Sequence, residues 1–382
     1  MKPPPFPRAR AAGLLLLALA GCRREALPNY PPAYHEYAYV TNSKSDSVSV
    51  IDVLHFKLLA NVPVGRNPTG VAVNPRKNEV YVVNSGSDNV SVIDAERNQV
   101  TAVVGVHHQP YFISVSPDGR RAYVANSGSA NVSVLDLEHR KVLVTLGVGA
   151  APGLAQVSPD GRTVVVSNRG GNSVSLLDAD KLVVRATLPA CQQPEEIAIL
   201  PDSSKAFVSC SGSNQVAAID LKSDKLLALL DIGRTPVHLA LKPDGGELLV
   251  SNFASDSISI IETGANEVGG SYLVGTQPVR GLVSADNSLL YVSNFGSGTV
   301  GVFSMDNRKL LAAVRVGSRP DALALSADQG ALLVADTASG DVAVVFTDPR
   351  RASFTLFTMI PVGLAPSQIA IKSFMATRPP AP

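Results

Sequence analysis

The sequence predicts an all-β fold, a β-propeller of four-stranded antiparallel blades, from three observations. A four-residue strand segment of the type Tyr-Val-Thr-Asn recurs along the chain, starting at Tyr39, Tyr81, Tyr123, Val165, Phe207, Leu249, Tyr291 and, in a degenerate copy, Leu333. The spacing is 42 residues at every step. The runs between these segments are β-branched and are bounded by turn residues. A fixed period in this range with about four strands per unit is typical of a radially repeated fold.

One unit shows how the four strands are expected to lie. Residues 68–73, 79–84, 90–94 and 99–105 are rich in Val, Ile and Thr, and Gly, Pro, Asn, Asp or Ser separates them. This pattern predicts a four-stranded meander. The first hairpin of several units carries a Pro-Asp-Gly turn, as at residues 243–245, in which Pro presets one dihedral angle and Gly accepts a positive φ. The aspartates of these turns are therefore expected to be structural.

Two landmarks give the number of blades. A proline opens one strand of each unit, at Pro68, Pro110, Pro152, Pro194, Pro236, Pro278, Pro320 and Pro366. The first Tyr-Val-Thr-Asn strand lacks a proline-led strand before it, and the last proline-led strand lacks a partner after it. Residues 366–374 are therefore expected to complete the blade begun by residues 37–65, which closes the ring and leaves no exposed edge. The prediction is eight blades, with seven blades and an irregular extra unit as the alternative.

The recurring segment also carries a family resemblance. Tyr39-Val40-Thr41-Asn42, followed by Ser43 and a Val-Ser-Val-Ile-Asp strand, resembles the YVTN family of β-propeller repeats over about residues 37–374. The resemblance implies an exported or surface protein. Its fold would be close to the propellers of cytochrome-type nitrite reductases, quinoprotein subunits and lactonases. It implies a shape and a compartment, and no particular reaction.

The N-terminus has the layout of a bacterial export signal. Basic residues precede an apolar run from Ala11 to Ala20, which ends in Leu19-Ala20-Gly21-Cys22. This ending resembles a lipobox, so residues 1–21 are predicted to be a lipoprotein signal peptide and Cys22 the lipidated residue. Residues 22–36 are then a tether, residues 37–374 the propeller and residues 375–382 a disordered tail. The expected location is periplasmic or at the cell surface, anchored to a membrane by lipid.

Composition narrows the function classes. Lys and Arg number 33 against 32 Asp and Glu, so no basic field favours nucleic acid. The six histidines show no metal-ligand spacing, and no Cys-x-x-Cys-His motif provides a covalent heme site. Tryptophan is absent, which argues against propellers that hold pyrroloquinoline quinone on tryptophan. The sequence therefore predicts neither a metal nor a cofactor.

Two cysteines remain if Cys22 carries lipid. Cys191 stands where the unit has Gly65, and Cys210 stands where it has Asn84. Both positions lie at the same end of one blade, and an oxidising compartment preserves disulfides. A Cys191–Cys210 disulfide is one expectation, and two buried thiols are the other.

The most broken part of the repeat predicts the functional site. The second residue after the blade-opening proline is Glu196, His238 and Arg280 in three consecutive blades, and inner strands begin around the central channel. The same face is expected to carry further unusual residues, namely Glu195, Asp321, Arg169, Phe253 and Phe295. These eight residues suit an anionic or carbonyl ligand, with Arg280 pairing the anion and the phenylalanines covering an apolar part. In an enzyme, His238 would be the general base and Glu196 its partner. The alternative is a salt-bridged rim that only joins the blades.

These observations favour a non-catalytic, membrane-anchored binding or scaffold propeller. It would offer its channel face to an unknown protein or small-molecule ligand and would not bind nucleic acid. A lactonase-type small-molecule enzyme is the first alternative. An accessory protein of an exported redox system is the second, and it rests only on analogy with fold relatives.

Overall fold

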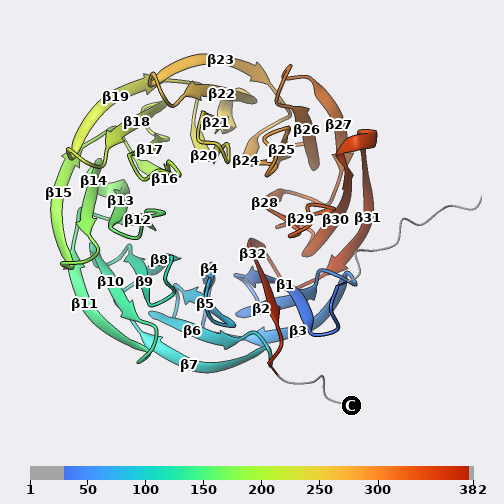
Figure 1. Ribbon diagram of the computed structural model, residues 1–382, viewed down its shortest axis with the longest axis horizontal. Coiled ribbons are helices and arrows are strands. Elements are labelled where there is room, and N and C mark those ends of the chain that lie inside the picture. Colours follow the sequence, from blue (N-terminus) through green and yellow to red (C-terminus); the bar gives the residue numbers. More distant parts are fainter. Residues whose placement is uncertain (1–29, 378–382) are drawn as a thin grey trace, which may run out of the picture.

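The computed structural model describes residues 30–377 and forms an eight-bladed β-propeller around a central channel (Figure 1). Each blade is a four-stranded antiparallel sheet. The eight-blade prediction is confirmed, and the seven-bladed alternative does not apply. We number the blades 1 to 8 in chain order and call their strands inner, second, third and outer from the channel outward.

The strand boundaries follow the repeat closely. From inner to outer strand, blade 1 consists of β32 (Pro366–Met375), β1 (Tyr34–Asn42), β2 (Ser47–Asp52) and β3 (Lys57–Pro63), and blade 2 of β4 (Pro68–Val73), β5 (Glu79–Asn84), β6 (Asn89–Asp94) and β7 (Gln99–Gly105). Blade 3 consists of β8 (Pro110–Val115), β9 (Arg121–Asn126), β10 (Asn131–Asp136) and β11 (Lys141–Gly147), and blade 4 of β12 (Pro152–Val157), β13 (Thr163–Asn168), β14 (Ser173–Asp178) and β15 (Val183–Pro189). Blade 5 consists of β16 (Pro194–Ile199), β17 (Lys205–Cys210), β18 (Gln215–Asp220) and β19 (Lys225–Asp231), and blade 6 of β20 (Pro236–Leu241), β21 (Glu247–Asn252), β22 (Ser257–Glu262) and β23 (Glu267–Leu273). Blade 7 consists of β24 (Pro278–Val283), β25 (Leu289–Asn294), β26 (Thr299–Ser304) and β27 (Leu310–Arg315), and blade 8 of β28 (Pro320–Leu325), β29 (Ala331–Asp336), β30 (Asp341–Asp348) and β31 (Ser353–Pro361). Short 3₁₀ turns follow β13, β21 and β30, at η1 (Arg169–Gly171), η2 (Phe253–Ser255) and η3 (Pro349–Arg351).

The hydrophobic core lies between the blades. Second and third strands are buried on both faces, whereas the outer strands alternate between exposed and partly buried residues. One core cluster joins Tyr123 and Val132 of blade 3 to Val164 and Leu177 of blade 4, and similar clusters join the other neighbours. Burying apolar surface between every pair of blades is the main force that holds the ring together.

Pairing of the first and last strands closes the ring. β32 runs antiparallel to β1, from Tyr34 opposite Met375 to Asn42 opposite Pro366. The closure is as expected, although both strands pass the boundaries drawn from the sequence: β1 begins before residue 37 and β32 continues past residue 374. Residues 34–36 are therefore strand and not tether. The signal segment and Cys22 lie outside the described residues. Within residues 30–377 no helix is long and apolar enough to cross a membrane.

A recurring asparagine–glycine contact fixes the loops on one face. Six second strands end in a buried asparagine, and five of these asparagines donate from Nδ2 to a serine hydroxyl on the third strand at 2.9 Å, as Asn84 does to Ser91. A Cβ atom on Gly65, in the loop that enters this blade, would lie 2.7 Å from the Asn84 side chain. The backbone must approach closely here, and only glycine allows it.

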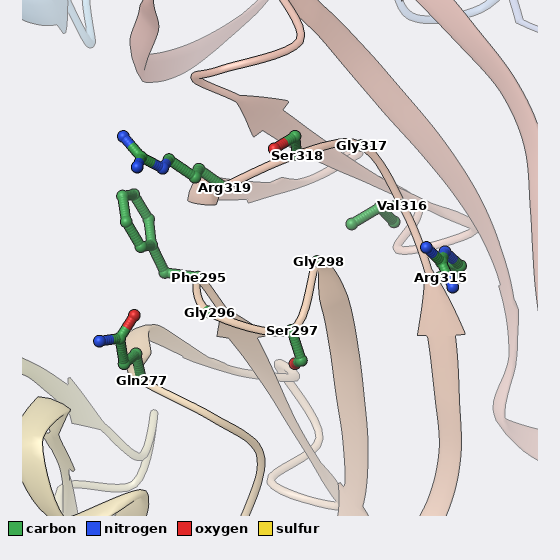
Figure 2. A pocket seen from close by; sticks show the side chains of 10 residues that line it. All are labelled: Gln277, Phe295, Gly296, Ser297, Gly298, Arg315, Val316, Gly317, Ser318 and Arg319. Carbon is green, nitrogen blue, oxygen red and sulfur yellow. The ribbon is translucent and has the colours of Figure 1, made fainter.

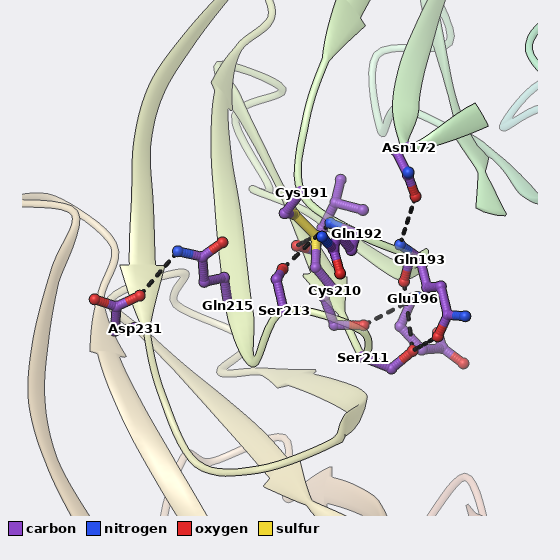
Figure 3. Close-up of a disulfide and its surroundings, with 12 residues drawn as sticks. Asn172, Cys191, Gln192, Gln193, Glu196, Cys210, Ser211, Ser213, Gln215 and Asp231 are labelled. Carbon is purple, nitrogen blue, oxygen red and sulfur yellow. Dashed lines mark hydrogen bonds between the residues drawn. A yellow bond between two sulfur atoms is a disulfide. The ribbon is translucent and has the colours of Figure 1, made fainter. Parts of the chain in front are cut away.

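Blade 5 replaces this contact by a covalent bond. Cys191 and Cys210 occupy the glycine and asparagine positions, and they form a disulfide with their Cα atoms 5.7 Å apart (Figure 3). Both residues are buried. The disulfide ties the loop that leaves blade 4 to the second strand of blade 5.

Blade 8 replaces the asparagine by an acid. Asp336 is fully buried and faces Asp341, at a position where blade 2 has Asn89. Burial and the neighbouring Asp341 raise the pKa of Asp336 to about 8. The side chain is therefore protonated in the folded protein at neutral pH, whereas it ionises when the chain unfolds.

The disulfide generates the first prediction. Reducing agent should lower the free energy of unfolding of the wild-type chain by about 3 kcal/mol, because the closed loop no longer restricts the unfolded state. A Cys191→Gly, Cys210→Asn double variant restores the glycine–asparagine contact of the other blades, so it should fold and be insensitive to reductant. Denaturant titrations with and without reductant measure both effects. If reducing agent lowered the free energy of unfolding equally in both proteins, the disulfide would not be the cause of the loss.

The second prediction concerns pH. When folding raises the pKa of a carboxyl group, the free energy of unfolding falls as the pH rises from the ordinary pKa of the group, about 4, towards its pKa in the folded protein. Asp336→Asn should therefore stabilise the protein more at about pH 8.5 than at about pH 5, by roughly 2 kcal/mol or more. Thermal unfolding at the two pH values tests this. Asn294→Asp in blade 7 is the matched control and should introduce a similar loss at high pH. A pH-independent effect of Asp336→Asn would count against a buried neutral acid.

Candidate functional site

The predicted site residues lie on one face of the ring, which we call the mouth face. Inner strands begin there, beside the channel, and the loops between second and third strands and between blades share this face. The inner strands supply Glu195, Glu196, His238, Arg280 and Asp321, and the loops supply Arg169, Phe253 and Phe295. The repeat thus delivers all eight residues to the same end of the channel.

Arg280 is the hub of the channel mouth. Its Nη1 atom lies 3.1 Å from Glu196 Oε1, and its Nε atom lies 3.8 Å from Asp321 Oδ1. The three side chains come from blades 7, 5 and 8, so the guanidinium reaches past blade 6. Each side chain keeps only a fifth to a quarter of its surface exposed, at 22%, 20% and 26%. We call Arg280, Glu196 and Asp321 the Arg280 brace, because they join blade 7 to its neighbour blade 8 and to blade 5, which is not its neighbour.

Burial and charge act in opposite directions within the brace. Burial raises the pKa of both Glu196 and Asp321 above their ordinary values, and the Arg280 guanidinium opposes this by favouring their ionised forms. The two carboxylates in turn raise the pKa of Arg280, although burial works against them. Arg280 is therefore already neutralised by protein groups and is a poor receptor for a ligand anion.

His238 is engaged by the backbone. Its Nδ1 atom accepts the N–H of Gly281 at 3.2 Å. Burial, followed by the charge of Arg280, holds the pKa of His238 well below its usual range, so the imidazole is neutral. Glu196 pairs with Arg280 and not with His238. The structure thus does not bring together the base and the acid partner that the sequence suggested for an enzyme.

Two small cavities flank the brace among the described residues. One, of about 130 Å³, is lined by Tyr111, Arg169, Glu195 and the brace residues Glu196 and Arg280. A second, of about 180 Å³, continues along Phe112, Gln156 and Gln368. The Arg169 guanidinium lies 4.7 Å from the centre of the Tyr111 ring, a favourable cation–π contact. No group of three or more metal-ligating side chains occurs among residues 30–377.

The two phenylalanines form an aromatic edge on the mouth face. The rings of Phe253 and Phe295 are 6.3 Å apart and tilted by 58°. The Arg319 guanidinium lies 5.5 Å from the centre of the Phe295 ring. Sequence reasoning missed Arg319 and Tyr111. The signal for Tyr111 was available, because it follows the blade-opening proline where the neighbouring blades have Thr69 and Gly153.

One family model matches part of the chain. Residues 74–206 match the family described as Cytochrome D1 heme domain. No curated protein matches the sequence.

Three solved structures have similar folds. Dihydro-heme d1 dehydrogenase NirN in complex with DHE is 17% identical at a TM-score of 0.73, with 87% of this chain and 74% of that chain covered. A functionally unknown protein from Desulfotomaculum acetoxidans is 18% identical at 0.62, with 77% and 99% covered. Kuenenia stuttgartiensis hydrazine synthase is 23% identical at 0.58, with 70% and 91% covered. Identities this low establish the β-propeller fold and nothing finer.

The Arg280 brace generates the third prediction. Arg280→Met should cost about 3 kcal/mol of unfolding free energy at neutral pH, because two largely buried carboxylates lose their cation. The loss should shrink at about pH 4, where the carboxyl groups are protonated. Arg315→Met, an exposed residue of the same blade, is the control and should change stability little. A loss that is the same at both pH values would show that Arg280 contributes packing and not charge.

Proposed function

We propose that the protein is an exported, non-catalytic binding or scaffold propeller that uses its mouth face. The Arg280 brace carries this proposal. It pairs Arg280 with Glu196 and Asp321 at the channel entrance, and the Nδ1 atom of His238 accepts a backbone N–H. A lactonase-type mechanism needs a base held beside its nucleophile, whereas Glu196 and Asp321 contact Arg280 and the Nδ1 atom of His238 accepts a backbone N–H. This face also carries exposed Tyr111 and the half-buried side chains of Arg169, Phe253 and Phe295, which suit recognition.

The two cavities beside the brace do not fit the heme implied by the family match. Cavities of about 130 and 180 Å³ flank the brace, whereas pockets for ligands of this size run to roughly 300–1,000 Å³. His238, the only histidine among the inner-strand residues at the mouth, is half-buried beside the Arg280 cation. We therefore assign no step to a heme within this chain.

An accessory role in an exported redox system is the second candidate. The similar folds include a dehydrogenase of dihydro-heme d1 and a hydrazine synthase, whose names denote redox chemistry. In this role the propeller binds a redox partner through the mouth face and itself transfers no electrons. The comparisons favour this candidate over a lactonase.

Membrane attachment through Cys22 completes the proposal. The described chain begins on the face opposite the mouth, where the Tyr30 hydroxyl donates to Asp328 at 3.1 Å in the first hairpin of blade 8. A lipid on Cys22 would tether that side, and the mouth face would point away from the membrane. Fatty-acid labelling of the wild type, and its loss in Cys22→Ser, would support this part.

Photo-crosslinking tests the binding role. We expect a photoreactive phenylalanine analogue in place of Phe253 to capture one defined partner in membranes of the native host. The same analogue in place of Lys222, exposed on the opposite face, is the control and should capture none. Heme staining of the captured species separates a redox partner from another partner. Equal capture from both faces, or hydrolysis of lactones by the purified protein, would contradict the proposal.

A further inference from the structure

Every blade places one residue in the left-handed conformation just before its third strand. In five blades this residue is Asp or Asn, and its side-chain oxygen accepts the backbone N–H of the residue 21 positions later, in the loop that enters the next blade. The five distances lie between 2.8 and 3.0 Å, and the residues are Asp46, Asp88, Asn172, Asn214 and Asp256. We call them the loop caps. They satisfy a backbone donor that otherwise has no partner.

Blade 7 has lost its loop cap. Gly298, with φ +65°, stands at this position and has no side chain. The corresponding donor is the N–H of Arg319, for which the described part of the chain provides no acceptor. A groove of about 560 Å³ opens between the two loops, with Gly298 at its centre (Figure 2). The groove occupies the space near the missing side chain.

The groove has also gained positive charge. Arg315 and Arg319 lie at opposite ends of it (Figure 2), and within residues 30–377 neither has a carboxylate within ion-pair distance. The ring of Phe295 lies against Arg319, and Ser297 and Ser318 add hydroxyl groups to the wall. An acidic cap is thus absent from a groove that carries a guanidinium group at each end and a free backbone N–H.

Two other blades also lack the loop cap, but the loops opposite them carry no arginine at the position of Arg319. Ala130 and Gly340 hold the equivalent positions, and the loops opposite them bring Ala151 and Ala365 where the groove has Arg319. Absence of the cap alone therefore does not produce a cationic groove. The combination occurs only between blades 7 and 8 of the eight described loops.

We infer that this groove binds a small organic acid through its carboxylate. The carboxylate takes the place of the missing Asp side chain and accepts the Arg319 N–H, as Asp256 accepts the N–H of Gln277 one blade earlier. The positive charges of Arg315 and Arg319 at the two ends of the groove favour the anion, and an aromatic or apolar body packs on Phe295. This site is separate from the channel and does not rest on the Arg280 brace.

Calorimetric titration with phenylacetate tests the inference, and the uncharged phenylacetamide is the control ligand. We expect saturable binding of phenylacetate alone to the full chain. Gly298→Asp supplies the cap from within, and Arg319→Gln removes one charge, so each should weaken binding by about tenfold or more. Left-handed aspartates at the five capped positions include Asp256, at φ 54°, which shows that the backbone accepts this residue.

Gly340→Asp is the matched variant, since it adds the same side chain one blade later and should leave binding unchanged. Thermal unfolding checks that each variant is folded. Absence of phenylacetate binding, equal binding of the amide, or undiminished binding to folded Gly298→Asp would overturn the inference.

Discussion

Antiparallel pairing of β32 with β1 is the interaction on which the rest of the structure depends. It fixes the number of blades at eight, and the number of blades sets the width of the channel. That width decides which side chains can meet across it. In a ring of eight blades, the Arg280 guanidinium of blade 7 lies close enough to Glu196 of blade 5 to form an ion pair. Closure at the edge of the ring thus determines the electrostatics at its centre.

The fold could be predicted from the sequence because the period is constant. Strand order, blade number and closure each follow from counting positions, and local turn chemistry agrees with them. The face on which the unusual residues gather could be predicted for the same reason. The ends of the closing strands at Tyr34 and Met375 could not, because residues outside the repeat have no second copy for comparison.

The chemistry of the site could be predicted only in part. The sequence shows that Glu196, His238 and Arg280 share a position, but it does not show which side chain reaches which. Arg280 is long enough to pass His238 and contact Glu196 and Asp321, and this depends on rotamers and channel width. The pairing turns three candidate ligand groups into a structural brace. His238 then faces Gly281, a contact that no spacing rule reveals.

The closure through a shared blade has a consequence for chain connectivity. Blade 1 is assembled from both ends of the propeller, so Tyr34 and Met375 are strand partners and lie side by side. The eight interblade loops take the same place in the strand order of the ring, although one carries the Cys191–Cys210 disulfide. A circular permutant that joins these ends and is opened in another interblade loop would keep every strand pair. It would lose only the covalent continuity of the loop that is opened. The closed ring thus separates two properties of the protein: its strand pairing does not depend on which interblade loop holds the chain ends.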